Sequence, residues 1–219
     1  NHLFPDTTYG CESGGDPKNI PDLTYENFLN FHRTYYHPSN SYIYLYGNMD
    51  MEEKLAFLDE HYLSHFDYLD VDSVIQEQKA FGACQDVTLE YPVAENEGEE
   101  DNTYLSYNMV VGNAADSQMA MAFEVLDYAL LSAPGAPLKQ ALLDVKAGKD
   151  VYGSYDDGIL QPYFTVIAKG SNPDRKEEFV SVIRQVLGDI VKNGIDRKAV
   201  EAGINYFEFR YREADFSSY

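Results

Sequence analysis

The 219-residue sequence lacks tryptophan, has two cysteines and is poor in basic side chains, with 16 Lys and Arg against 37 Asp and Glu. Neither Cys11 nor Cys84 sits in a C-x-x-C pair, so we expect two ordinary reduced thiols. No apolar run approaches the roughly 18 residues that a transmembrane helix needs, and no basic segment followed by an apolar stretch marks a signal peptide. We therefore expect no membrane partner. The compartment stays unknown, and would be the cytoplasm for a bacterial protein.

The negative charge is unevenly distributed along the chain. Residues 1–138 hold 24 acidic and 4 basic side chains, a net of −20, whereas residues 139–219 hold 13 and 12, a net of −1. Such a field repels phosphate backbones and anionic lipid surfaces and attracts cationic partners. We therefore expect no nucleic-acid partner. Two interpretations of the acidity stay open: partners that are basic peptides, or solubility alone.

What the sequence does contain is a globular composition, 44% apolar and 14% aromatic, arranged in periodic segments. The predicted helices span residues 24–36, 50–65, 116–131, 138–147, 172–193 and 196–216, and the predicted strands span 41–46, 87–91, 103–111, 151–155 and 163–168. Apolar stripes predict that the first two helices each bury one side. Residues 67–85 show no clear period and indicate a domain boundary, and the acidic run 95–101 predicts a solvated loop.

Residue chemistry alone indicates no catalytic machinery. His61 and His65 lie four residues apart on one predicted helix face, as metal ligands require, and Glu60 precedes the first of them. The remaining histidine of an inverted zinc motif is replaced by Phe57, whose phenyl ring cannot donate a lone pair. We therefore expect exposed histidines and no zinc site here. The sequence also has no nucleophile elbow, phosphate loop or dinucleotide fingerprint.

The segment of residues 3–50 combines loops dense in Gly, Pro and Asp with an aromatic helix. Its most particular stretches are Leu3-Phe4-Pro5-Asp6, Ser13-Gly14-Gly15-Asp16-Pro17, Tyr36-His37-Pro38-Ser39-Asn40 and Tyr46-Gly47. They resemble a segment of the pitrilysin/insulinase peptidases, zinc enzymes with an inverted H-x-x-E-H motif, and the presequence-protease branch in particular. Two later stretches, Pro134-Gly135-x-x-Leu138 and residues 205–216, resemble the second, metal-free domain of that family more loosely.

The resemblance implies an α+β fold, with antiparallel sheets and helices packed on one face. It implies that residues 1–80 are the C-terminal part of the first, metal-bearing domain without its zinc motif, and that residues 81–219 are most of the second, non-catalytic domain. In that family the zinc motif lies upstream of the matching segment, so the zinc cofactor is expected in the parent enzyme and not in this chain. We therefore predict that the chain alone is inactive.

The resemblance also implies a place where peptide binds. In relatives of the insulin-degrading type, an edge strand of the second domain anchors the substrate by strand addition, because an unpaired edge offers backbone donors and acceptors to any extended peptide. The residues at that place here are Val151, Tyr152, Gly153 and Ser154, with Gly135 and Ala136 nearby. The family's pair of glycines is not kept, because serine follows Gly153.

Three functional hypotheses follow from these observations. The first is a non-catalytic fragment of a zinc endopeptidase that degrades unstructured peptides in a closed chamber. This fragment would contribute chamber wall and a peptide-binding strand, and its partners would be peptides and the remaining domains of the parent. The alternative is a self-contained peptide-binding or scaffold subunit of a processing-peptidase-like complex. A third is a soluble α+β domain with an unrelated role.

Overall fold

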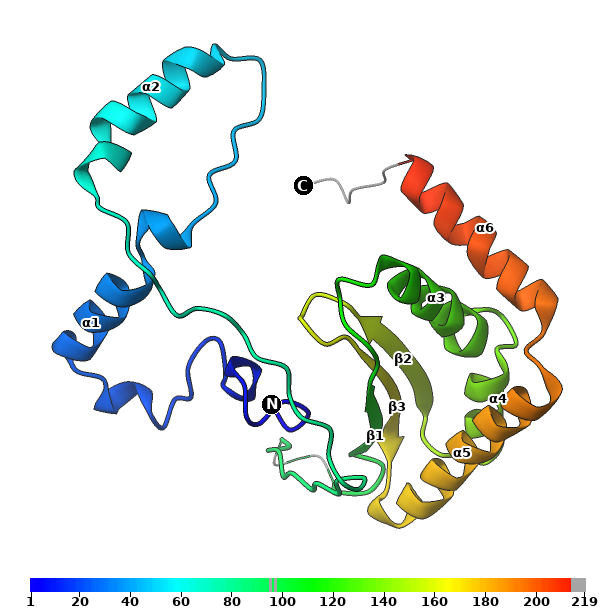
Figure 1. Cartoon of the computed structure of the whole chain (residues 1–219). Coiled ribbons are helices and arrows are strands. Elements are labelled where there is room, and N and C mark those ends of the chain that lie inside the picture. The colour runs from blue at the N-terminus through cyan, green and yellow to red at the C-terminus, as the bar shows by residue number, and fades with distance from the viewer. Residues whose placement is uncertain (95, 97, 214–219) are drawn as a thin grey trace. The chain divides into compact units, whose positions relative to one another are not determined.

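A computed structural model of the chain describes residues 1–94, 96 and 98–213 (Figure 1). The chain divides into two compact units, Asn1–Gln78 and Lys79–Tyr219. The assignment of the two parts of the chain to a first and a second peptidase domain stays a prediction. Cys11 and Cys84 are free and exposed. Among the described residues, no helix has the length and apolar character needed to cross a membrane.

The first unit is built from short helical segments. They are the α-helices α1 (Tyr25–Tyr35) and α2 (Met51–His61) and the 3-10 turns Thr8–Gly10, Ile20–Asp22, Pro38–Asn40 and Leu63–His65. Both α-helices begin where the sequence predicts. The Thr24 hydroxyl accepts a hydrogen bond from the Asn27 N–H at 3.1 Å, and the Asp50 carboxylate accepts one from the Glu53 N–H at 3.1 Å. Such caps satisfy backbone donors that the first turn of a helix leaves free.

Two predictions for the first unit are wrong. Residues 41–46 are extended but pair with no strand among the described residues, and the apolar stripes of α1 and α2 are not buried. Phe28 is 66% exposed and Leu55 is 55% exposed. Within Asn1–Gln78, burial is confined to Phe4 and Gln78. A strand needs a partner edge and a stripe needs a covering surface, and the first unit supplies neither.

The second unit contains a three-stranded antiparallel sheet in the order β1-β3-β2. Its strands are β1 (Thr103–Val110), β2 (Asp150–Asp156) and β3 (Tyr163–Ser171). All three are close to the predicted segments, and β2 and β3 form the predicted hairpin. The predicted strand 87–91 is wrong, because this segment is extended without a strand partner among the described residues. Of the predicted acidic loop, residues 95 and 97 lie outside the described residues.

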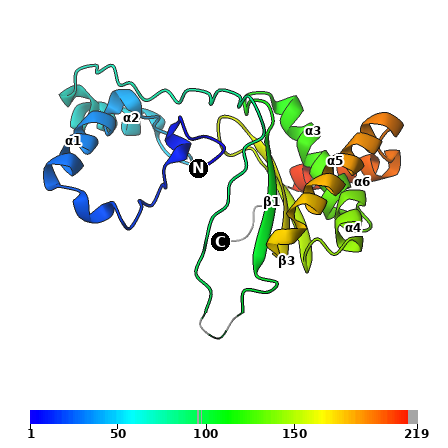
Figure 2. The same ribbon diagram turned by 90° about the horizontal axis from the view of Figure 1, so that it is seen from below.

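Helices cover one face of this sheet (Figure 2). They are α3 (Ser117–Asp127), which continues into a π-helical turn (Tyr128–Ser132), α4 (Pro137–Asp144) and α5 (Lys176–Asn193). The last helix, α6 (Arg197–Glu213), packs against α3 and the π-helical turn. Asp116 caps α3 as predicted by accepting from the Met119 N–H at 3.0 Å, and Gly194 ends α5 with φ at +87°. The predicted end of the last helix lies beyond the described residues. This arrangement confirms the α+β fold with helices on one face of an antiparallel sheet.

The core of the second unit lies between the sheet and the helices. Alternate residues of each strand face it, because side chains in a strand point to opposite sides of the sheet in turn. Its fully buried members include Leu131, Leu138, Leu142, Val151, Val166, Phe179 and Ile183. The apolar side of α5 is therefore buried, whereas the apolar sides of α1 and α2 are exposed.

Helix α5 offers a matched test of this core. Ile183→Ala removes a fully buried side chain and should lower the free energy of unfolding by about 2–5 kcal/mol. Val191→Ala, at a position 87% exposed, should change it by about 0.5 kcal/mol or less. Because the chain has no tryptophan, denaturant unfolding is followed by far-UV circular dichroism. Equal losses in the two variants would contradict the packing described here.

Candidate functional site

Strand β2, which carries the predicted residues Val151–Ser154, lies at one edge of the described sheet. Its backbone orientation follows from the pairing. The Val111 N–H, at the end of β1, donates to the Pro162 carbonyl at 2.8 Å, so the backbone carbonyl of Pro162 is directed toward β1. Backbone direction alternates along a strand, so the backbone N–H and C=O groups of Tyr163, Thr165 and Ile167 are directed toward β2.

Tyr152 lies opposite Ile167, and Ser154 lies opposite Thr165. Two opposite residues of an antiparallel pair direct their backbone groups the same way relative to the gap between them, so Tyr152 and Ser154 turn their N–H and C=O groups toward β3. The backbone N–H and C=O groups of Val151, Gly153 and Tyr155 therefore point out of the sheet. These three positions could pair with an added strand, and two of them are among the predicted site residues. Tyr152 and Ser154 point their side chains to the face without helices, where Tyr152 is 40% exposed.

Gly153 is the most tightly enclosed residue of this strand. A Cβ placed there would lie 2.3 Å from the Thr165 carbonyl oxygen and 2.5 Å from Leu131 Cδ1. A glycine therefore lets the edge strand lie close to both β3 and the helical layer.

The predicted residues Gly135 and Ala136 lie in the turn before α4. Gly135 has a φ of +73°, a conformation that favours glycine, and Ala136 is buried at 3% exposure. Helix α4 and the π-helical turn on either side of them both pack against β2. The two residues therefore support the layer beneath β2, and their role in binding peptide stays a prediction.

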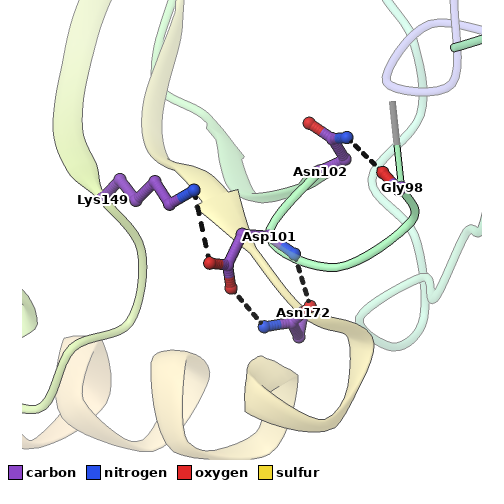
Figure 3. A network of polar contacts seen from close by, with 5 residues as sticks. All are labelled: Gly98, Asp101, Asn102, Lys149 and Asn172. Carbon is purple, nitrogen blue, oxygen red and sulfur yellow. Dashed lines mark hydrogen bonds and ion pairs between the residues drawn. The ribbon is translucent and has the colours of Figure 1, made fainter. Parts of the chain in front are cut away.

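A polar network anchors the start of β2 (Figure 3). The Asp101 N–H donates to Asn172 Oδ1 at 2.9 Å, and Asn172 Nδ2 donates to Asp101 Oδ1 at 2.8 Å. Lys149 Nζ, one residue before β2, lies 3.3 Å from Asp101 Oδ2. The Asn172 amide and then the Lys149 ammonium lower the pKa of Asp101 below its ordinary value of 3.8. The network joins the starts of β1 and β2 to the end of β3.

Carboxylates gather around the other end of β2. The Tyr163 hydroxyl donates to Asp156 Oδ2 at 3.0 Å. Burial, followed by the charges of Asp157, Glu124 and Asp116, raises the pKa of Tyr155. This end of the strand is therefore electronegative, which favours a cationic ligand group over an anionic one.

Two features near this sheet were not foreseen from the sequence. The Tyr211 hydroxyl donates to Glu124 Oε2 at 2.7 Å, and this bond, with burial, raises the pKa of Tyr211 to about 12. Burial raises the pKa of Asp127, which accepts from Ser132 in the π-helical turn. The Tyr211–Glu124 pair depends on the packing of α6 against α3, and the Asp127–Ser132 pair depends on the wider π-helical turn. No spacing pattern signals such contacts.

The described residues include no group of three or more His, Cys, Asp or Glu side chains that could hold a metal ion. His61 lies against the Phe57 ring, with 4.6 Å between ring centroids. His65 belongs to the separate 3-10 turn that follows α2. These side chains do not fit the donor set of a catalytic zinc, which needs three protein ligands.

Comparison with known proteins places these features in a family context. A family model described as the peptidase M16 inactive domain matches residues 22–207. The chain is 48% identical to the protein HypA of Clostridium perfringens, 36% identical to presequence protease 1 of Arabidopsis thaliana and 30% identical to the mitochondrial presequence protease of Xenopus laevis. Each match covers 99% of this chain and 20–22% of the relative. The chain therefore spans about a fifth of these relatives' length.

A solved structure gives an independent likeness of fold. An M16-like peptidase from Alicyclobacillus acidocaldarius superposes with a TM-score of 0.60, covering 93% of this chain and 47% of that one at 19% identity. At this identity the likeness shows the fold alone. Together with the sequence matches, it confirms the resemblance inferred from the loops of residues 3–50.

The contacts around Gly153 predict the effect of a single methyl group. Gly153→Ala should lower the free energy of unfolding by about 1–3 kcal/mol, because the Thr165 carbonyl and the Leu131 side chain must both move. Gly188→Ala is the control: it lies in α5 with no atom within 4 Å of the added Cβ, and should stabilise by roughly 0.5–1 kcal/mol. Denaturant unfolding measures both, and a tolerated Gly153→Ala would show that β2 is not held closely.

The Asp101 network predicts a pH dependence of definite sign. Because the folded-state pKa of Asp101 is lowered, its stabilising contribution is present above the ordinary pKa and is lost as pH falls through the lowered one. Asn172→Ala should raise this pKa more than Lys149→Met, and Lys192→Met, which removes a distant charge, should leave it unchanged. Carboxyl ¹³C shifts in an NMR titration report the pKa. An unchanged value in Asn172→Ala would refute the network.

Proposed function

The chain belongs to the family of M16 peptidase inactive domains, and we propose that it is the non-catalytic, peptide-binding part of a longer presequence-protease-like zinc metalloendopeptidase. In this proposal residues 1–80 complete the metal-bearing domain, and residues 81–219 form most of the second domain. The open face of the sheet becomes part of the chamber wall. The single observation that carries the proposal is the edge of β2 with which no described strand pairs, beside a sheet face that carries no described helix.

Strand addition explains how such an edge binds peptides of many sequences. An extended peptide placed beside β2 would donate to and accept from the backbone groups of Val151, Gly153 and Tyr155. Each hydrogen bond adds about 0.5–1.5 kcal/mol whatever the peptide side chains are. Peptide side chains on the uncovered face would meet Tyr152 and Ser154, which gives that face a means of preference without strict specificity.

Charge supports basic peptides as the preferred ligands. The carboxylates around Tyr155 lie at one end of β2, and residues 1–138 carry a net charge of −20. Such charges attract cationic peptides and speed their association, an effect that salt weakens.

Zinc is proposed for the parent enzyme only. The described His, Cys, Asp and Glu side chains form no site of the kind a catalytic zinc needs, so no step of peptide cleavage is assigned to residues of this chain. The unburied stripes of α1 and α2 support a role for the parent's other domains as partners, because apolar surface of this extent is normally covered.

Backbone methylation of a peptide tests the proposal. An unstructured basic peptide N-methylated at alternate residues loses the amides that would face β2, whereas methylation of the other alternate set leaves them intact. We expect one of the two patterns to weaken binding by roughly tenfold or more, because each lost backbone bond is worth about 1 kcal/mol. Fluorescence anisotropy of the labelled peptides gives both affinities. Equal affinity of both methylated peptides and the unmodified one would contradict strand addition.

A further inference from the structure

In the second unit, an open groove runs between α3 and α6, which lie side by side (Figure 1). It has a volume of about 350 Å³, and all of its lining residues belong to these two helices. On α6 they begin with Ile204 and recur three, four, seven and eight residues later, and on α3 they begin with Met121 and recur three and four residues later. Each wall is therefore one face of a helix, and the groove follows α6 for about two turns, roughly 10 Å.

Contacts between the two helices hold the walls of the groove in place. A Cβ added at Gly203 would lie 3.2 Å from Tyr128 Cδ1, so the glycine lets α6 lie close to the end of α3. The rings of Tyr206 and Tyr128 stack with their centroids 5.1 Å apart. Two turns further along α6, the Tyr211 hydroxyl donates to Glu124 Oε2 at 2.7 Å. The groove is therefore formed before any ligand arrives, which lowers the cost of binding.

The apolar side chains of the groove are open to solvent. Met121 is 54% exposed and Ile204 is 49% exposed, and Val125 and Phe207 are half-buried. A small molecule between such walls would stay open to water, whereas pockets for small ligands bury most of the ligand. A third helix would cover both walls, because its side chains can fit between those of two neighbouring helices. The flexible side chain of Met121 can adapt to such a partner.

Charge around the groove favours a positively charged partner. The lining contains two carboxylates, Glu124 and Glu208, against one guanidinium, Arg212. Glu208 Oε1 lies 2.6 Å from Arg212 Nη2, whereas Glu124 forms no ion pair with the described residues. The charge of Asp157 also acts on Tyr211 at this end of the groove. The whole chain has a net charge of −21, which opposes a second copy in the groove and attracts a cationic partner.

We propose that the groove between α3 and α6 is the docking site for a partner protein that presents an amphipathic, positively charged helix. The apolar stripe of that helix would cover the four apolar side chains of the groove, and a Lys or Arg beside the stripe would pair with Glu124. The hydrogen bond from Tyr211 holds the Glu124 carboxylate at the rim before the partner arrives. The site lies in the helical layer and is independent of strand addition to β2.

Binding of a designed helical peptide to the 219-residue chain tests the proposal. The probe is a peptide of roughly 18 residues, long enough to form a helix, with leucine along one face and lysine elsewhere. A scrambled peptide of the same composition keeps the charge and loses the apolar stripe. A version with glutamate in place of lysine keeps the stripe and reverses the charge. Fluorescence anisotropy at physiological ionic strength should show that the probe binds at least about tenfold more tightly than either control peptide.

Single substitutions locate the binding site of the probe. Ile204→Ser removes an apolar side chain from one wall and should weaken binding by roughly tenfold. Val191→Ser, at an exposed position of α5 outside the groove, should leave the affinity unchanged. Glu124→Gln keeps an oxygen that can accept from Tyr211 but removes the charge, so it should weaken binding and reduce its dependence on salt. Phe28→Ser, on the exposed side of α1, controls for binding to the first unit.

Equal affinity of the scrambled peptide, or unchanged binding to Ile204→Ser, would overturn the proposal, as would a loss of binding confined to Phe28→Ser. Displacement of the probe by the unstructured basic peptide that tests strand addition would also overturn it, because the two sites are separate. Equal affinities of the N-methylated peptides with the probe still bound would refute the proposed function alone. Sedimentation equilibrium showing dimers of the wild-type chain that Ile204→Ser abolishes would make a second copy the occupant, and would contradict the proposed partner.

Discussion

The pairing of β3 with two neighbours is the constraint on which the second unit depends. Because residues of a strand alternate in both side-chain face and backbone direction, the hydrogen bond from the Val111 N–H to the Pro162 carbonyl, with the register of the strands, shows the orientation of every residue in the sheet. It places the side chains of Val166 and of the residues two apart from it under the helices, and leaves those of Thr165 and Ile167 on the face that carries no described helix. The same alternation decides which backbone groups of β1 and β2 are available to another strand.

Two sets of contacts hold the edge strand β2 against the rest of the second unit. Gly153 lets it approach both β3 and Leu131, and the Asp101 network ties its first residues to the ends of β1 and β3. A rigid edge loses little conformational entropy when a peptide pairs with it. In the proposed function, the affinity for peptide therefore comes from backbone pairing and not from contacts with particular peptide side chains. The carboxylates near Tyr155 add a preference for positively charged peptides.

Local sequence signals predicted the elements that local interactions determine. Thr24, Asp50 and Asp116 cap their helices as expected because a cap depends on residues three apart. Segments 41–46 and 87–91 have strand patterns but no strand partner in the part of the chain that the structure describes, because pairing depends on residues far along the chain. The same holds for the link between Asp101 and Asn172, which are 71 residues apart. The site residues rested on family resemblance, and the structure adds which backbone groups of β2 point outward.

Amide hydrogen exchange at β2, with and without a saturating unstructured basic peptide, tests the central claim most directly. The account predicts slower exchange at Val151, Gly153 and Tyr155 when peptide is bound, because these amides become donors to the added strand. Ser106 and Asn108 on β1 should not change. Peptide binding that leaves the three β2 amides unaffected would contradict the claim that the edge of β2 is the binding site.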